Sequence, residues 1–219
     1  MTVNKAVIFD FDGLILDTET VEVSIWQDLF LEAGITFDLE AYRDSVGSYA
    51  IHPYRPEKIL EAIQQNGRTA ADIAEEVRNR TIEITSECQP MPGVLSVIQS
   101  AKAKGLKLAV GSSSPMNWVK PHLVRLGLWN QFDTVVTNDD VALCKPSPEI
   151  FLKVLNRLDV QPYHAIVLED SANGVLAANR AGIPVVVIPN EITWKQRLDG
   201  AAMCLSSLNE LNLDLFFTN

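Results

Sequence analysis

Two pairs of acidic side chains follow short apolar runs that are typical of buried strands. Asp10 and Asp12 come after the run 6–9, and Glu169 and Asp170 come after the run 165–168. Carboxylates held close together repel one another unless a cation lies between them or one of them is protonated. Oxygen ligands favour a hard cation, and Mg²⁺ is the usual one beside phosphate. These two pairs are therefore candidates for a metal site.

Each pair also has an ordinary structural interpretation. Asp and Gly are common in a turn after a strand, so Asp10 to Gly13 fits a turn as well as a site. Asp170 or Ser171 fits the N-cap of a following helix. A calcium loop that begins at Asp10 is excluded, because its sixth and twelfth positions need Gly and Glu. The chain has Ile and Val there.

A cluster of hydroxyl side chains follows a third apolar run, 106–110. Ser112 and Ser113 precede Pro115, which begins a helical pattern. Hydroxyls and free backbone N–H groups at a helix N-terminus can bind an anion such as phosphate. A plain Ser N-cap followed by Pro explains the same residues. A serine-hydrolase turn needs Gly where Pro115 stands, so that chemistry is disfavoured.

Lys145 is a further candidate, in the loop Leu143-Cys144-Lys145-Pro146. Its neighbours are apolar, and prolines at 146 and 148 restrict the backbone around it. Most isolated lysines are solvated surface charges, so Lys145 alone predicts little. Beside two acidic pairs and a serine cluster, it supplies the positive charge that a phosphoryl group needs.

The elements that carry these residues alternate between strands and helices. Strands are expected over 6–9, 106–110, 134–137, 165–168 and 184–188, and helices over 92–104, 115–126, 148–158 and 172–181. This alternation predicts a doubly wound, Rossmann-like α/β core with a parallel sheet. Ligands of such sheets bind beyond the carboxyl ends of the strands, where the candidate residues would meet.

One long stretch interrupts the alternation. Residues 18–89 show only helical patterning, with apolar positions that indicate helices around 29–33, 59–63 and 73–84. The exit at 89–93 contains two prolines and is expected to be stiff. We therefore expect residues 1–17 and 90–219 to form the α/β core, and residues 18–89 to form a helical cap domain inserted after the first strand.

Composition narrows the class of partner. The chain has 219 residues, with 18 Lys+Arg against 28 Asp+Glu and a net charge of −10. This charge disfavours nucleic acid and anionic membranes. Three scattered cysteines indicate a reducing compartment, and neither a signal peptide nor an apolar run of about 20 residues is apparent. We expect a soluble cytoplasmic protein, and a monomer.

The candidate motifs together resemble a known family. DFDGLILDTE (10–19), VGSSS (110–114), KPSPEIF (145–151) and LEDSANGVLAANRAG (168–182) occur in the order found in the haloacid dehalogenase superfamily. Within it, the chain is similar to the β-phosphoglucomutase-like phosphatases, the branch with a helical cap. The resemblance covers nearly the whole chain, and the four motifs are much more specific jointly than singly.

The resemblance implies a role for each core residue. Asp10 would be the nucleophile that forms an aspartyl-phosphate. Asp12 would be the general acid and base, and its backbone carbonyl would help to bind Mg²⁺. Ser112, Ser113 and Lys145 would hold the phosphoryl oxygens. Asp10, Asp12, Glu169 and Asp170 would form the Mg²⁺ site, with Glu169 either a direct ligand or one step removed from the metal.

The expected reaction follows from Asp12 in the core and from residues of the cap. Dehalogenase members lack an acidic residue at the position of Asp12, so Asp12 favours phosphoryl transfer. Mutase members carry a His at the position that aligns with Glu22. The absence of that His from this chain favours hydrolysis over the mutase reaction. We expect a Mg²⁺-dependent phosphatase for a small phosphomonoester such as a sugar phosphate, with Tyr49, His52 and Arg55 as candidate substrate contacts. A phosphohexose mutase and a phospho-accepting signalling or binding protein are the alternatives.

Overall fold

The computed structural model describes residues 4–43, 46, 61 and 68–217. It has an α/β fold whose sheet contains six parallel strands in the order β3-β2-β1-β4-β5-β6. The strands are β1 (Ala6–Phe9), β2 (Lys107–Gly111), β3 (Thr134–Val136), β4 (Ala165–Glu169), β5 (Val185–Val187) and β6 (Met203–Cys204). The α-helices are α1 (Glu19–Glu32), α2 (Leu39–Arg43), α4 (Ala70–Thr85), α5 (Val94–Ala103), α6 (Met116–Arg125), α7 (Glu149–Leu158) and α8 (Ala172–Arg180). The predicted fold class is confirmed.

The register of the sheet places the candidate residues together. β1 lies between β2 and β4, and Phe9 pairs with Val110 on one side and Leu168 on the other. The next residues along these strands are Asp10, Gly111 and Glu169. The sheet therefore presents the first acidic pair, the serine cluster and the second acidic pair at one edge.

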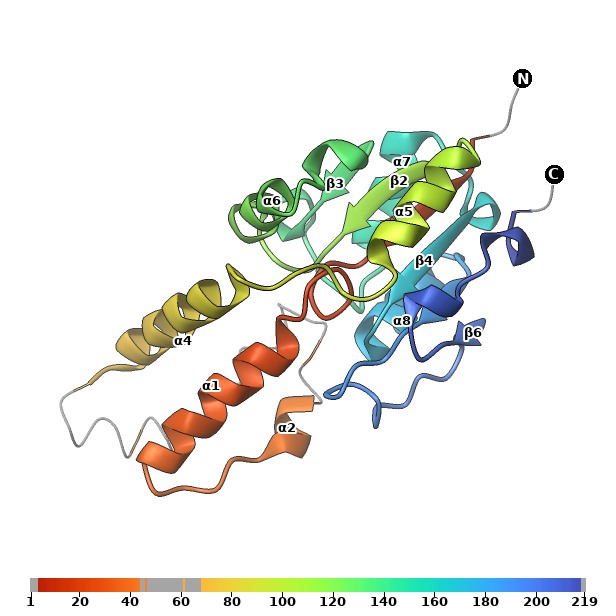
Figure 1. Cartoon of the computed structure of the whole chain (residues 1–219). Helices are drawn as coiled ribbons and strands as arrows, with labels where there is room; N and C mark the ends of the chain where they lie inside the picture. The colour runs from red at the N-terminus through yellow and green to blue at the C-terminus, as the bar shows by residue number, and fades with distance from the viewer. Residues whose placement is uncertain (1–3, 44–45, 47–60, 62–67, 218–219) are drawn as a thin grey trace.

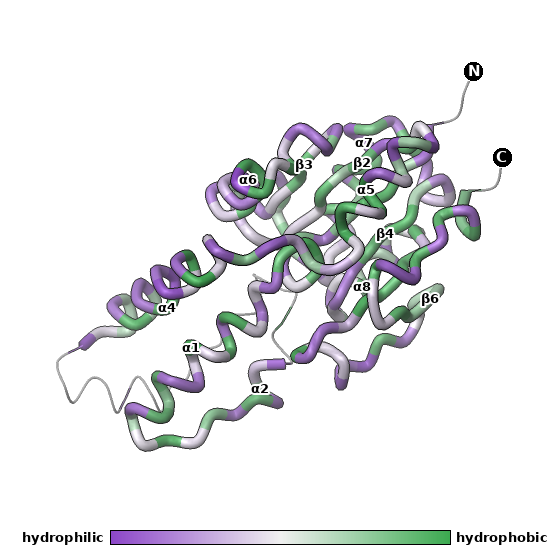
Figure 2. The backbone as a smooth tube through the Cα atoms, in the orientation of Figure 1, coloured by the Kyte–Doolittle hydropathy of each residue, from purple (hydrophilic) through white to green (hydrophobic). Residues whose placement is uncertain are grey.

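Helices cover both faces of the sheet. Alternate residues of the central strands face opposite ways, as the pleat requires, so the strands feed two separate apolar clusters. One cluster packs against α5 and α6, and the other packs against α7 and α8. Figure 2 shows the resulting hydrophobic centre in contrast to the more hydrophilic α4. Strands that are buried on both faces are expected to be apolar, and β1 and β5 are apolar along their whole length, whereas β2 begins with Lys107 and β4 ends with Glu169.

The remaining helices form a group beyond one end of the sheet. α1, α2 and α4 lie away from the two termini (Figure 1). They share an apolar cluster that includes Trp26, Leu29, Phe30 and Ile73. An ion pair of 2.6 Å between Arg80 and Asp28 also joins α4 to α1. We refer to these three helices as the cap helices; the domain limits at residues 18 and 89 stay a prediction.

Several local features differ from the expected ones. β6 is two residues long, and α2 is five, so neither shows a periodic pattern in the sequence. Residues 70–85 form a single helix, in which Ile82 and Ile84 are partly exposed rather than packed. The helix expected around 59–63 lies outside the described residues. None of the described helices combines the length and the apolar character needed to span a membrane.

Candidate active site

A cavity of about 830 Å³ lies between the cap helices and the carboxyl edge of the sheet. Asp10, Asp12 and Ser113 line it from the core. Glu19, Glu22, Trp26 and Tyr42 line it from α1 and α2, and Val77 and Arg78 line it from α4. Three of the predicted core residues thus share a cavity with groups of the cap helices.

The first contact in the site joins Asp10 to Lys145 and Glu169. The Lys145 ammonium lies 2.5 Å from Oδ1 of Asp10 and 2.5 Å from Oε1 of Glu169. Lys145 is 1% exposed and Glu169 is fully buried, so neither charge is shared with solvent. Lys145 is therefore a buried counter-ion, in contrast to the solvated state of most isolated lysines.

Burial dominates the electrostatics of this trio. It raises the pKa of Asp10 to about 8, with the Glu169 charge as the next cause, while Lys145 opposes both. Burial alone would lower the pKa of Lys145, but Asp10 and Glu169 reverse that effect and raise it. Lys145 therefore stays in its ammonium form. A further positive charge near Asp10 would lower its pKa and favour the carboxylate form.

Asp12 lies in a separate set of contacts. β1 ends at Phe9, so the strand does not continue to Asp12 as a simple alternation would require. One carboxylate oxygen of Asp12 accepts from Thr18 Oγ1 at 3.0 Å and from Trp118 Nε1 at 2.8 Å. The other accepts from Ser114 Oγ at 2.6 Å and from Ser112 Oγ at 3.4 Å. Four donors therefore fix the orientation of this side chain.

Three buried carboxylates could bind a metal. Asp10, Glu169 and Asp170 each offer an oxygen, and these atoms lie within 4.8 Å of one another. The donor set is all oxygen, as a hard divalent cation requires. Burial and then Glu169 raise the pKa of Asp170 well above its ordinary value, because the cluster has more negative charge than Lys145 balances. The residues therefore fit a cation.

Glu169 is further held by the start of α8. Its Oε2 accepts from the backbone N–H groups of Asp170 at 3.0 Å and Ser171 at 3.1 Å, and from Ser171 Oγ at 3.0 Å. A methyl group on Gly174 would lie 1.8 Å from Glu169 Cδ. The glycine in this motif thus makes room for the carboxylate against the helix.

The structure brings together all the predicted core residues. Ser112 and Ser113 are buried beside Asp12 and the cavity, at the carboxyl end of β2. The cap candidates Tyr49, His52 and Arg55 lie outside the described residues. Their contacts with substrate stay a prediction.

Sequence reasoning missed several residues of the site. Trp118, Ser114 and Thr18 hold Asp12, and Asn190 donates to Asp170 at 2.7 Å. Ser114 could have been proposed from the sequence, because it follows Ser112 and Ser113 directly. Trp118 and Asn190 are brought in by a helix and a loop whose directions have no local signal in the sequence.

Two glutamates of α1 were also missed as part of the cavity. Glu19 accepts from the Tyr42 hydroxyl at 3.3 Å, and Glu22 accepts from Trp26 Nε1 at 3.2 Å. Burial raises the pKa of both, and for Glu19 the neighbouring Glu22 adds to the effect. These carboxyl groups give the cavity polar groups that can form hydrogen bonds.

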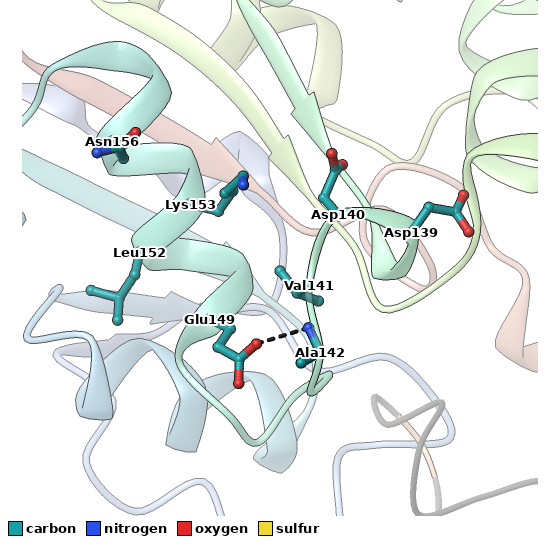
Figure 3. A pocket seen from close by; sticks show the side chains of 8 residues that line it. All are labelled: Asp139, Asp140, Val141, Ala142, Glu149, Leu152, Lys153 and Asn156. Carbon is teal, nitrogen blue, oxygen red and sulfur yellow. Dashed lines mark hydrogen bonds between the residues drawn. The ribbon is translucent and has the colours of Figure 1, made fainter.

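A second hollow, of about 720 Å³, lies between the segment after β3 and α7 (Figure 3). Its acidic side chains already have partners. Glu149 accepts from the backbone N–H of Ala142 at 2.9 Å, and Asp140 is paired with Arg157. None of the predicted site residues lines this hollow, so the chemistry is assigned to the first cavity.

Comparison with known proteins decides the family. A family model described as haloacid dehalogenase-like hydrolase matches residues 7–188. This chain belongs to that family. The match runs from the second residue of β1 to the residue after β5, so it includes all the core site residues predicted from the sequence.

Individual haloacid dehalogenase-like relatives match over almost their full length. YhcW of Bacillus subtilis is 37% identical over 211 residues, which are 96% of this chain and 95% of that protein. The phosphorylated carbohydrates phosphatase of Thermotoga maritima is 33% identical over 214 residues, 94% of this chain and 96% of the relative. The crystal structure of CbbY from Rhodobacter sphaeroides with xylulose-1,5-bisphosphate has a TM-score of 0.72 and 28% identity, and covers 96% and 97% of the two chains. The chain is a phosphoric monoester hydrolase of this family.

Proposed function

We propose that the protein is a Mg²⁺-dependent phosphatase that hydrolyses a small phosphorylated carbohydrate through an aspartyl-phosphate on Asp10. The observation that carries the proposal is the position of Asp10. Its carboxylate faces the cavity, and Lys145 lies beside it with a positive charge. The relatives named as phosphatases of phosphorylated carbohydrates and of hexitol support the class of substrate.

In the proposed first step, an oxygen of Asp10 attacks the phosphorus of the ester. A bond forms between that oxygen and phosphorus, and the bond from phosphorus to the carbohydrate oxygen breaks. The leaving oxygen takes the electron pair and receives a proton from Asp12. Lys145 and the serine groups stabilise the charge on the phosphoryl oxygens during the transfer.

In the second step, Asp12 takes a proton from water. The water oxygen then attacks phosphorus, and the bond to Asp10 breaks, which releases phosphate and restores the Asp10 carboxylate and the protonated form of Asp12. Asp10, Glu169 and Asp170 would hold Mg²⁺, together with the backbone carbonyl of Asp12. When bound, the cation neutralises phosphoryl charge and favours the ionised form of Asp10.

The pocket above the nucleophile supports a polyhydroxyl substrate. Glu19 and Glu22 offer carboxyl groups that can hydrogen-bond to hydroxyls, and Trp26 and Trp118 line the same cavity with apolar ring surface. Such a mixture of convergent polar groups and aromatic surface is typical of small-molecule sites.

The test is phosphate release from a panel of sugar, polyol and other metabolite phosphates, with Mg²⁺ and with a chelator in its place. We expect release from carbohydrate esters only with Mg²⁺, and a loss of about 10³-fold or more in Asp10→Asn, the size of effect that removal of a nucleophile has. Asp199→Asn, at an exposed site, is the matched control. Conversion of one sugar phosphate to another without phosphate release would indicate a mutase, and full activity of Asp10→Asn would refute the nucleophile assignment.

A further inference from the structure

Asn190, in the loop after β5, contacts one of the candidate metal ligands. Its Nδ2 donates to Oδ2 of Asp170 at 2.7 Å. Asp170 is 1% exposed, so this hydrogen bond is shielded from water. A donor on one oxygen of a carboxylate fixes its rotation and leaves the other oxygen for a cation.

The amide of Asn190 is itself fixed in one orientation. Its Oδ1 accepts from the backbone N–H groups of Ile192 at 2.8 Å and Thr193 at 3.0 Å, and from Thr193 Oγ1 at 3.2 Å. Thr193 Oγ1 in turn accepts from the Asn190 backbone N–H at 3.0 Å. Three donors to Oδ1 leave Nδ2 as the group that faces Asp170.

The Asp170–Asn190 contact also explains the glycine of the first motif. Gly13 has φ +74°, and a methyl group added there would lie 2.3 Å from Asp170 Oδ2 and 2.7 Å from Asn190 Nδ2. A side chain at Gly13 would therefore push the pair apart. The loop after β1 and the loop after β5 together enclose this hydrogen bond.

The other end of the same loop is joined to the cap helices. We call residues 190–196 the strap. Ile192 is buried in the apolar cluster of the cap helices, and its backbone carbonyl accepts from Arg43 Nε at 2.9 Å. Gln196 donates to the Arg43 carbonyl at 2.5 Å and accepts from the Ala172 backbone N–H at 2.8 Å. The strap thus connects α2, the start of α8 and Asp170.

We infer that Asn190 is a positioning residue for the metal ligand Asp170, and that the strap makes this position depend on the docking of α2. The inference rests on the proposed Mg²⁺ site. If two parts of the molecule are linked in this way, a change at the α2 end of the strap must alter cation binding, although it touches no ligand.

The test is Mg²⁺ binding to the full chain by isothermal titration calorimetry, without substrate. Asn190→Ala is expected to weaken binding by about 10- to 100-fold, the usual effect of losing a group that orients a metal ligand. Asn130→Ala, at an exposed site, is the matched control and should bind as the wild type does. Thr193→Val, which removes the hydroxyl that fixes the amide, should also weaken binding, and Thr193→Ser should restore it. These two variants keep the test valid if Asn190→Ala does not fold.

Gln196→Ala tests the link to the cap helices. We expect weaker Mg²⁺ binding in the same direction, by about 2- to 10-fold within the usual range of linkage between sites. Arg80→Met, which breaks an ion pair within the cap helices, should leave binding unchanged. Unchanged affinity in Asn190→Ala and Thr193→Val would overturn the positioning role, and unchanged affinity in Gln196→Ala would overturn the link. Absence of Mg²⁺ binding by the wild type would instead refute the proposed metal site itself.

Discussion

At the scale of single residues, the site depends on charges that are buried and balanced by one another. Lys145 is the positive charge that contacts two of the carboxylates, and it is almost completely buried. Removing one member of such a group leaves the others without compensation, which costs far more than a surface ion pair contributes. This residue therefore supports folding as well as the proposed reaction.

Lys145→Met is expected to lower the free energy of unfolding by about 3–5 kcal/mol, because Asp10 and Glu169 lose their shared counter-ion. Urea denaturation measures the change. Lys153→Met, an exposed lysine on α7, should change stability by less than about 0.5 kcal/mol. Equal midpoints for Lys145→Met and the wild type would show that the trio is not held together as the contacts indicate.

Glu19 predicts a pH-dependent stability. Its pKa is raised well above the ordinary value of 4.5, chiefly by burial. The folded state therefore binds the proton more tightly than the unfolded state, and stability is lost as the pH rises through the raised pKa. Glu19→Gln should remove this loss, so its Tm should exceed that of the wild type by about 2–4 °C for each kcal/mol regained.

The gain should be small near the ordinary pKa of 4.5 and should increase toward neutral and higher pH. Differential scanning calorimetry across that range measures it. Glu83→Gln, at an exposed site on α4, is the control and should show no such trend. A Tm difference that stays constant with pH would contradict the assignment of the effect to Glu19 ionisation.

At the scale of elements, the junction of β4 with α8 is held by several hydrogen bonds and one close contact. Glu169 ends the strand, and its carboxylate accepts from the first N–H groups of the turn into the helix. Gly174 lies in the first turn of α8, where the carboxylate occupies the space that a side chain would need. The short motif therefore encodes a packing requirement as well as acidic residues.

Gly174→Ala should destabilise the protein by about 1–3 kcal/mol, because the new methyl group overlaps Glu169. On helix propensity alone the same change would stabilise by about 1 kcal/mol, so the sign of the result is decisive. Guanidinium denaturation measures it, with Asn79→Ala on the exposed face of α4 as the control. A stabilised Gly174→Ala variant would show that Glu169 can move without cost.

The sequence predicts the strands because they are continuous apolar runs, and it predicts the core helices because they are long enough to show their period. The helix expected over 115–126 is α6 (Met116–Arg125), and the strand expected over 165–168 is β4 (Ala165–Glu169). β6 and α2 were missed because two and five residues are too few for a pattern. Contacts such as Trp118 to Asp12 depend on helix direction after folding, which the local sequence does not specify.

At the scale of the whole molecule, the net charge of −10 does not prevent a phosphorylated substrate from binding. Some of the acidic residues are gathered within the core, where Lys145 and the proposed Mg²⁺ would neutralise their charge. The cavity is bounded by the core on one side and the cap helices on the other. In the proposed reaction, the core would act on the phosphoryl group, and the cap helices would contact the rest of the substrate.

The most direct test of the account is to trap the phosphorylated enzyme. A substrate found in the panel is mixed with the enzyme and Mg²⁺, the reaction is quenched in the steady state, and the acyl phosphate is reduced with borohydride before peptide mass spectrometry. We predict homoserine in place of Asp10 and at no other acidic residue. An unmodified Asp10 peptide from an enzyme that is turning over, or reduction at a different residue, would contradict the central claim.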